Sequence, residues 1–407
     1  MVICLKEKFD SLISEVFADA ILCASTAADE ICVNIFLIGG IVRDLIMNNS
    51  IKDVDIAVQA DAIQFGTFLE EKFGCEVVSV QENLRTSKVK FPNGVVIDFA
   101  STREERYTES GVLPVAFNFG CELEKDVKRR DFTINTLALK LSGENKFSLV
   151  DYFNGYNDIQ NGQIKILHEK SFIDDPSRII RALKFKERFD FEIEEKTSNL
   201  MQEYLQNIND KMPLERVKGE LRQYFEIKKE GLYSRFIESS AYNLISNNPI
   251  MEIDEDRFKA LYEYNLFDEN EKWFIYIVLL ILNSDYAVER LNLTAFEKKV
   301  LKEVRELIKK SPNKDKVSVY NLFKNLTDTS ICVYYIATGS SLVELFLGAL
   351  RDIKVLITGN DLIKLGFLPS PYFNKLFDAV LKEKLDGKLK TKEEEIEFLK
   401  KYIKEEE

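Results

Sequence analysis

Three aspartates are spaced so that they could hold a divalent cation together. Asp53 and Asp55 stand two residues apart at the predicted beginning of a strand, so their side chains share one face of it. Two neighbouring carboxylates repel each other, and Mg²⁺ relieves that repulsion while keeping positions for water and phosphate oxygens. Alone the pair could equally be two surface acids, but Asp98 follows the apolar run 95–97 in a strand that could pair beside 53–58. A third carboxylate there would complete a two-metal site.

A glycine pair precedes these acids along the chain. Gly39 and Gly40 separate a short apolar strand from a predicted helix, and Arg43 adds a positive charge near the beginning of that helix. Glycines let backbone N–H groups approach a phosphate, and a helix N-terminus carries partial positive charge. A glycine pair after a strand is also an ordinary tight turn, and the dinucleotide pattern G-x-G-x-x-G is absent. The pair alone is therefore a weak signal for a phosphate site.

The elements that must position these residues form an alternating pattern of strands and helices. Apolar runs predict strands at 33–38, 54–58, 76–80, 87–91 and 95–100, with helices at about 40–47 and 62–73. Asn93-Gly94 predicts a hairpin between the last two strands, because this pair readily adopts positive φ. We expect a small mixed sheet with helices on one face.

Residues 103–118 interrupt this pattern. They contain charges, a glycine and a proline without a sustained period, which predicts a long loop, and such loops in compact domains are usually functional or disordered. After about Leu123 the chain is predicted to be mostly helical, with apolar residues at helical spacing in 177–189, 214–225, 274–282, 296–308 and 372–385. The predicted fold class is α+β, with a mixed sheet at the N-terminal side and helices after it.

Composition limits the possible classes of function. The chain has 407 residues and is 45% hydrophobic, enough for a sizeable core in more than one domain, and its net charge of −12 argues against indiscriminate binding of polyanions. The six cysteines are scattered and His168 is the only histidine, so we expect no zinc site of Cys and His. The longest apolar run, 273–282, is too short to span a bilayer, and the charged N-terminus is unlike a signal peptide. We expect a cytoplasmic protein with no membrane contact.

The order of motifs resembles the class II tRNA nucleotidyltransferase and bacterial poly(A) polymerase family. Gly-Gly-x-Val-Arg-Asp at 39–44 is followed by Asp-x-Asp, and 129–135 is similar to the family's R-R-D-F-T-x-N segment. The run 174–178, Asp-Asp-Pro-Ser-Arg, resembles its nucleotide-templating helix, and 215–221 resembles its E-R-x-x-x-E-L element. Shorter similarities at 359–362 and 386–387 match the family's tail. The resemblance is dense over about 36–225 and sparse beyond.

The resemblance implies a head at 1–139, a neck at 140–225, a body at 226–330 and a tRNA-binding tail at 331–407. In the head it implies a flexible loop at about 103–118. It assigns metal binding to Asp53 and Asp55, with Asp98 as the third acid. The other residues that it implies around the nucleotide are Gly39, Gly40 and Arg43 at the triphosphate, and Arg130, Asp131 and Asn135 at the ribose and phosphates.

Base selection is implied at the beginning of the templating helix. The two base-reading positions fall on Asp175 and Arg178, and a carboxylate acceptor beside a guanidinium fork can imitate a Watson–Crick edge. Pro176 fits a first helical turn, so these acids could also simply cap the helix, and the two roles can coexist. Arg181 and Lys184 follow at the spacing of a phosphate-facing stripe. Two glutamates of the next motif, Glu215 and Glu220, are predicted to form structural ion pairs with nearby basic side chains.

Members of this family add CCA, CC, a terminal A or poly(A). The full-length loop at 103–118 disfavours CC-only activity, and the acidic C-terminal end disfavours a poly(A) polymerase. Full CCA addition and A-only addition both stay open. The expected partners are CTP, ATP and tRNA held by its acceptor–TΨC arm through weak, salt-sensitive contacts, with Mg²⁺ as cofactor. A non-catalytic RNA-binding protein and an antibiotic-modifying nucleotidyltransferase are rivals that the intact acids and the large helical part disfavour.

Overall fold

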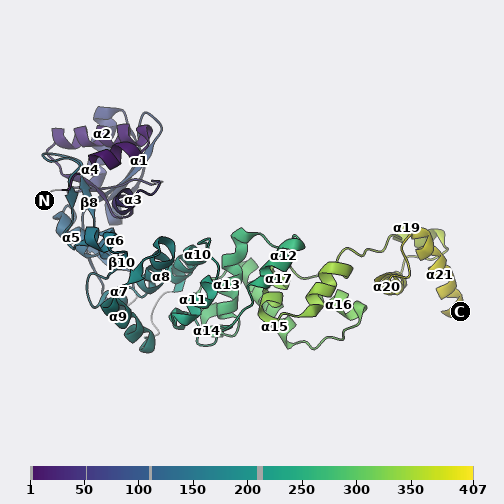
Figure 1. The fold of residues 1–407 in the computed structure, drawn as a ribbon. Helices are drawn as coiled ribbons and strands as arrows, with labels where there is room; N and C mark the ends of the chain where they lie inside the picture. The colour runs from purple at the N-terminus through teal and green to yellow at the C-terminus, as the bar shows by residue number, and fades with distance from the viewer. Residues whose placement is uncertain (1–2, 52, 110–111, 209–213, 407) are drawn as a thin grey trace. The chain divides into compact units, whose positions relative to one another are not determined.

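The computed structural model describes residues 3–51, 53–109, 112–208 and 214–406 (Figure 1). The chain forms two compact units. The first comprises Met1–Lys229 with Glu238–Leu244, and the second comprises Glu230–Ile237 with Ile245–Glu407. The division into head, neck, body and tail is finer than these two units and stays a prediction.

The first unit is built on a seven-stranded mixed sheet with the strand order β3-β4-β5-β2-β1-β8-β9. Neighbouring strands are antiparallel except β2 and β5, which are parallel. The strands are β1 (Ile35–Ile38), β2 (Asp55–Val58), β3 (Glu76–Gln81), β4 (Thr86–Lys90), β5 (Val96–Ser101), β8 (Ala138–Lys140) and β9 (Leu149–Val150). The predicted mixed sheet is thus confirmed, and it continues beyond residue 139 to Val150.

Helix α4 (Ala62–Phe73) covers one face of this sheet. Its first turn is capped by the Asp61 carboxylate, which accepts hydrogen bonds from the N–H groups of Ile63 and Gln64. On its buried side, the ring of Phe65 packs edge-on against that of Phe99 in β5, with 5.4 Å between centroids. Because side chains alternate along a strand, this contact assigns the odd-numbered residues of β5 to the covered face.

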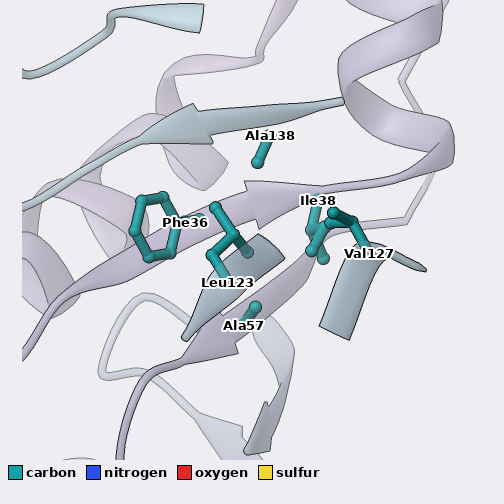
Figure 2. Packing of buried hydrophobic residues seen from close by; sticks show 6 residues of the cluster. All are labelled: Phe36, Ile38, Ala57, Leu123, Val127 and Ala138. Carbon is teal, nitrogen blue, oxygen red and sulfur yellow. The ribbon is translucent and has the colours of Figure 1, made fainter. Parts of the chain in front are cut away.

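Helix α5 (Leu123–Lys128) packs on the opposite face. Leu123 and Val127 contact an apolar patch formed by Phe36 and Ile38 of β1, Ala57 of β2 and Ala138 of β8 (Figure 2). The register pairs Phe36 with Ala57, and Ala57 is on the other side of β2 from Ile56, the partner of Phe99. The expectation of helices on one face is therefore wrong. Residues 123–128 are too short for their apolar spacing to indicate which face they cover.

The predicted loop at 103–118 is in part regular structure. Its two ends pair as the antiparallel strands β6 (Glu104–Arg106) and β7 (Val115–Phe117). The Glu105 carboxylate fixes the base of this hairpin by accepting from Arg103 and Arg129 at 3.1 and 2.9 Å. The prediction of an irregular segment was wrong at these ends, because three-residue strands held by ladder bonds and ion pairs need no alternation of apolar residues.

The remaining elements of residues 3–225 surround the sheet and continue from it. They are α1 (Lys6–Leu12), α2 (Glu15–Glu30), α3 (Gly40–Ile46), α6 (Gly155–Gln160), β10 (Gln163–Ile164), α7 (Ser171–Asp174), α8 (Ser177–Phe189), β11 (Glu192–Ile193), α9 (Glu195–Gln206) and α10 (Leu214–Phe225). Strands β10 and β11 form a small parallel pair. Helices α8 and α10 have the bounds that their apolar spacing predicted.

The chain beyond α10 is helical, as predicted. The α-helices are α11 (Leu232–Glu238), α12 (Asp256–Glu263), α13 (Lys272–Ile281), α14 (Asp285–Arg290), α15 (Ala295–Lys309), α16 (Lys316–Phe323), α17 (Asp328–Thr338), α18 (Ser341–Leu345), α19 (Gly359–Lys364), α20 (Tyr372–Leu385) and α21 (Lys392–Glu406). Helix α13 is buried from Phe274 to Ile281. Within the described ranges, every helix is too short or too polar to cross a membrane.

The last three helices are joined by a buried glutamate. Glu395 in α21 is fully buried and accepts hydrogen bonds from the N–H groups of Leu356 and Ile357, each at 2.9 Å. The Lys384 ammonium of α20 forms an ion pair with the same carboxylate. An apolar cluster that includes Ile357, Leu376 of α20 and other buried residues lies beside this junction.

We expect Glu395→Gln to loosen this junction. The neutral amide keeps the shape but loses charge-assisted hydrogen bonds worth about 2 kcal/mol, which corresponds to roughly 30-fold faster exchange of the Leu356 and Ile357 amide protons. Hydrogen exchange measured by mass spectrometry tests this, with the exposed neighbour Glu393→Gln as control. Equal protection in the two variants would contradict the anchoring role of Glu395.

Candidate active site

The sheet register brings two of the three predicted acids together. Asp55 begins β2 and is paired in register with Asp98 of the parallel strand β5, so both carboxylates lie on the face opposite α4. Asp53 precedes the strand by two residues and is exposed. Asp55 is exposed as well, but loss of hydration beside the surrounding groups and the charges of Asp98 and Asp53 raise its pKa, although Arg130 and Lys88 oppose the shift. A cation bound here would relieve this repulsion, so the donor set fits a divalent metal.

The third acid is held by a lysine. The Lys88 ammonium lies 3.2 Å from the Asp98 carboxylate, and the two residues are opposite each other on β4 and β5. Across the part of the chain that the structure describes, no three carboxylate, thiol or imidazole groups are arranged to hold a metal. The strand pairing predicted for Asp98 is confirmed, while its role as a metal ligand stays a prediction.

The glycine turn permits a close approach of Arg130. Gly39 has φ +78°, and a Cβ atom there would lie 2.6 Å from Nη1 of Arg130, so only glycine fits without displacing the guanidinium. Gly40 begins α3 directly after this turn. Arg130 in turn is 3.5 Å from the Asp126 carboxylate of α5. The turn thus brings backbone N–H groups and a guanidinium next to the acids.

Arg43 is buried, with its guanidinium engaged by protein groups. Its Nε and Nη2 donate to the two carboxylate oxygens of Asp44 at 3.1 and 3.0 Å, and Nη1 donates to Asn135 at 2.6 Å. The guanidinium also stacks over the ring of Phe189, 4.7 Å from its centroid. This geometry makes Arg43 a bridge between α3 and the segment at Asn135, whereas the sequence suggested a direct contact with triphosphate.

Asp131 is the centre of a buried polar network. Its Oδ1 accepts from the Asn135 side chain at 2.9 Å and from the Phe132 N–H at 2.8 Å, and its Oδ2 lies 2.5 Å from Nη2 of Arg181. Burial opposes ionisation of Asp131, but Arg181 and these hydrogen bonds hold its pKa below the ordinary value. The network joins the segment after α5 to helix α8 and fixes both relative to the glycine turn through Arg43.

The two cations that follow on α8 are held by a glutamate of α10. Glu220 accepts from Lys184 at 2.6 Å and lies 3.5 Å from Arg181. The predicted pairing of Glu220 with nearby basic side chains is therefore confirmed. Because Arg181 and Lys184 both face this carboxylate, they bind α8 to α10, and the interpretation of the two as a phosphate-facing stripe gains no support. The side chain of Glu215 lies outside the described residues.

Asp175 both caps α8 and faces a hollow. Its Oδ1 accepts from the N–H and Oγ of Ser177 at 3.1 and 2.5 Å, which is the capping interaction considered from the sequence. Its Oδ2 accepts from Nη2 of Arg216 at 2.8 Å. Arg216 belongs to the E-R-x-x-x-E-L element, of which sequence reasoning weighed only the glutamates. The carboxylate is thus fixed at both oxygens in this structure.

Arg178 is fixed one turn further along the same helix. Nη1 donates to the Ser171 hydroxyl at 2.7 Å, while Nη2 donates to the carbonyl of Arg129 at 3.0 Å and lies 3.4 Å from the hydroxyl of Tyr107. Tyr107 follows β6, so the hairpin segment reaches the predicted base-reading residue. Sequence reasoning missed Tyr107 and Arg129, because their contacts depend on tertiary structure.

Two adjoining hollows contain the predicted residues other than Gly39 and Asp98, and Gly40 lines both. The larger, of about 970 Å³, is lined by Asp53 and Asp55 together with Asp44, Lys184 and Arg188. The smaller has a volume of about 380 Å³. Its lining includes all of the predicted nucleotide residues except the first glycine: Gly40, Arg43, Arg130, Asp131, Asn135, Asp175, Arg178 and Arg181. The structure therefore collects residues that are up to 141 positions apart in sequence around one turn of chain.

Part of the chain matches a known protein family. Residues 35–165 match the family of the poly A polymerase head domain. The A-adding tRNA nucleotidyltransferase of Geobacter sulfurreducens is 30% identical over 404 residues, which cover 90% of this chain and 45% of that protein. The chain thus spans less than half the length of this relative. The A-adding tRNA nucleotidyltransferase of Halalkalibacterium halodurans is 28% identical, covering 92% of this chain and 90% of that protein.

Solved structures share the fold over nearly the whole chain. An apo form of a CCA-adding enzyme has a TM-score of 0.81 at 24% identity and covers 98% of this chain and 99% of its own. The Thermotoga maritima CCA-adding enzyme, solved with tRNA, has a TM-score of 0.77 at 24% identity, with 99% of each chain covered. The match to the poly A polymerase head domain thus covers residues 35–165, and the chain as a whole shares the fold of CCA-adding enzymes.

Proposed function

We propose that the chain adds nucleotides from CTP and ATP to the 3′ end of tRNA without a nucleic-acid template, releasing pyrophosphate. One observation carries the proposal: the acid pair and the base-reading pair line two adjoining hollows that meet at Gly40. A nucleotide with its base near Asp175 and Arg178 could extend its triphosphate past Gly40 toward Asp53 and Asp55. The tRNA would be held by its acceptor–TΨC arm, mostly through backbone contacts.

The proposed cofactor is Mg²⁺, held by Asp53 and Asp55. Members of this family normally use divalent metal ions. When bound, the metal would neutralise triphosphate charge and lower the pKa of the RNA 3′ hydroxyl. Asp98 supplies a third carboxylate on the same sheet face.

The proposed base selection rests on two side chains of fixed orientation. Arg216 and Ser177 hold the Asp175 carboxylate, and Ser171 with the Arg129 carbonyl holds the Arg178 guanidinium. A carboxylate accepts from an exocyclic amine, and a guanidinium donates to ring nitrogen or carbonyl acceptors. Cytosine and adenine both carry an amine beside such acceptors, so one pair could read both bases.

Triphosphate binding is proposed at the glycine turn. The proposed donors are the N–H groups at the beginning of α3, directly after Gly39, and the guanidinium of Arg130, which lies against Gly39. Arg130 lines two of the hollows beside the glycine turn, so its guanidinium can face an anion bound there. Asp131 and Asn135 would act by holding Arg43 and Arg181, which shape the space around the ribose and phosphates.

A second candidate is addition of the terminal A alone, with CC supplied by another enzyme. The A-adding relatives favour it, since one of them is matched over 90% of its length. The CCA-adding enzyme of Bacillus cereus is 27% identical over 88% of this chain and 92% of that protein. This relative favours full CCA addition. A poly(A) polymerase and a non-catalytic RNA-binding protein rank lower.

Extension of three tRNA transcripts tests these candidates. The transcripts end at the discriminator base, at C or at CC, and each receives labelled CTP, labelled ATP or both with Mg²⁺. Extension of the bare end to CCA would establish full CCA addition. Extension of only the CC end by ATP would establish the A-adding candidate. No extension of any transcript would contradict the proposed function.

A further inference from the structure

A lysine completes a row of charges across the open face of the sheet. The register places Asp55 of β2 beside Asp98 of β5, and Asp98 beside Lys88 of β4. The Lys88 Nζ atom lies 3.2 Å from Oδ1 of Asp98, and the side chains are 46% and 53% exposed. Because residues paired in register point to the same side, the lysine lies two strands away from Asp55 on the same surface.

This surface is not covered by α4. The neighbours of Lys88 on β4, Ser87 and Val89, are buried on the other side, and the Ser87 hydroxyl donates to the Ala62 carbonyl of α4 at 2.7 Å. Lys88 instead opens into a hollow of about 440 Å³. Asp55, Asp98 and Gly40 line the same hollow, whereas Asp53 is not part of its lining.

Lys88 differs from the other cations of this hollow. Arg103, Arg129 and Arg130 are mostly buried, at 13%, 18% and 23% exposure, and each is bound to Glu105 or Asp126. Lys88 has one ion-pair partner among the described residues, the Asp98 carboxylate, at a half-exposed position where such pairs are weak. Its long side chain can therefore leave Asp98 at little cost while staying beside the acids.

We propose that Lys88 acts as a stand-in cation at Asp98. A divalent metal displaces the Lys88 ammonium, and the ammonium then binds the phosphodiester backbone at the 3′ end of the acceptor RNA. The ammonium neutralises Asp98 while no metal is bound. With a metal held at Asp98, the Lys88 ammonium would lose its ion pair with this carboxylate and would extend into the open hollow. A backbone phosphate of the incoming RNA strand then replaces Asp98 as the negatively charged partner of the ammonium. The RNA contact rests on the proposed function, whereas the competition for Asp98 does not.

Binding of Mn²⁺ to the protein alone tests the first part. Lys88→Met removes the competing charge but keeps the length of the side chain, so Mn²⁺ titrated by electron paramagnetic resonance should bind about threefold more tightly than in wild type. Lys88→Arg should restore the wild-type affinity. The matched control is Lys90→Met, which removes an ion pair of 3.7 Å with Glu76 from the same face of the same strand. It should leave Mn²⁺ binding unchanged.

The RNA contact is tested by the salt dependence of acceptor binding. For Lys88→Met, the slope of log affinity against log salt should fall by about one, and KM for the RNA should rise about fivefold with kcat within twofold. Lys90→Met should keep the wild-type slope. Equal Mn²⁺ affinity in wild type and Lys88→Met would overturn the stand-in role, even if no RNA is extended. An unchanged salt slope would overturn the RNA contact.

Discussion

Replacing Asp55 by Asn is expected to slow nucleotide incorporation at least about 10³-fold, the equivalent of roughly 4 kcal/mol of transition-state stabilisation. The amide keeps the shape of the side chain but lacks the charge that holds a divalent metal. Binding of tRNA should stay within about twofold of wild type, since one carboxylate contributes little to an interface made through phosphates. Single-turnover extension with saturating Mg²⁺ and filter binding of the same tRNA measure the two quantities.

The same variant should not lose stability. The pKa of Asp55 is raised in the folded protein by loss of hydration and by Asp98, so the charged form opposes folding at neutral pH. That cost diminishes as pH falls through the raised pKa, and Asn removes it at every pH. Asp19→Asn, an exposed aspartate of α2, is the control for both measurements. Wild-type incorporation by Asp55→Asn would remove this residue from the mechanism.

Replacing Arg178 by Ala is expected to lower kcat/KM for ATP by about 10²- to 10³-fold. Two charge-assisted hydrogen bonds to a base contribute roughly 1.5–3 kcal/mol each, of which part is offset by water. Discrimination against UTP and GTP should fall in parallel, because the guanidinium fork both recognises the correct base and rejects others. Competition between labelled ATP and each other triphosphate on one acceptor measures the ratio directly.

Two variants separate base reading from the structural contacts of Arg178. Arg178→Lys keeps the charge but cannot hold Ser171 and the Arg129 carbonyl together, so it should recover little selectivity. Lys186→Met on the exposed side of the same helix, where Lys186 donates to Glu192 at 2.6 Å, should keep wild-type selectivity. If Arg178→Ala lost rate while keeping its preference for ATP over UTP, the residue would act only as a structural support.

Periodic segments of the chain were predicted closely. Helices α4, α8 and α20 have the predicted bounds because local signals define them: Asp61 caps α4, and Asp175 with Pro176 begins α8. The hairpin at Asn93-Gly94 formed for a similar reason, since Gly94 adopts φ +87° between β4 and β5. In these places each element is specified by residues within a few positions of its ends.

The predictions that were wrong, and the contacts that were not predicted, depend on segments far apart in the sequence. The strand β7 has no apolar alternation that distinguishes it from a loop, and the face covered by α5 follows only from the register of β1 with β2. Register also decides that Lys88 reaches Asp98, which the spacing of the acids does not reveal. The pairing of Arg216 with Asp175 joins residues 41 positions apart.

The sequence therefore predicted which residues form the candidate site better than it predicted the contacts between them. The sequence indicated that Asp53, Asp55, Asp175 and Arg178 act together, and the structure places them around one glycine. The sequence did not indicate that Arg43 is buried against Asp44 and Asn135, because the partners of a side chain depend on what packs around it.

Single-turnover extension of a tRNA transcript ending in CC, with each of the four nucleoside triphosphates offered separately, tests the central claim most directly. The account predicts that the wild-type protein with Mg²⁺ adds one A from ATP, releases pyrophosphate, and incorporates little from UTP or GTP. A failure to extend this end, or equal use of all four triphosphates, would contradict a site in which Asp175 and Arg178 select the base for transfer at Asp53 and Asp55.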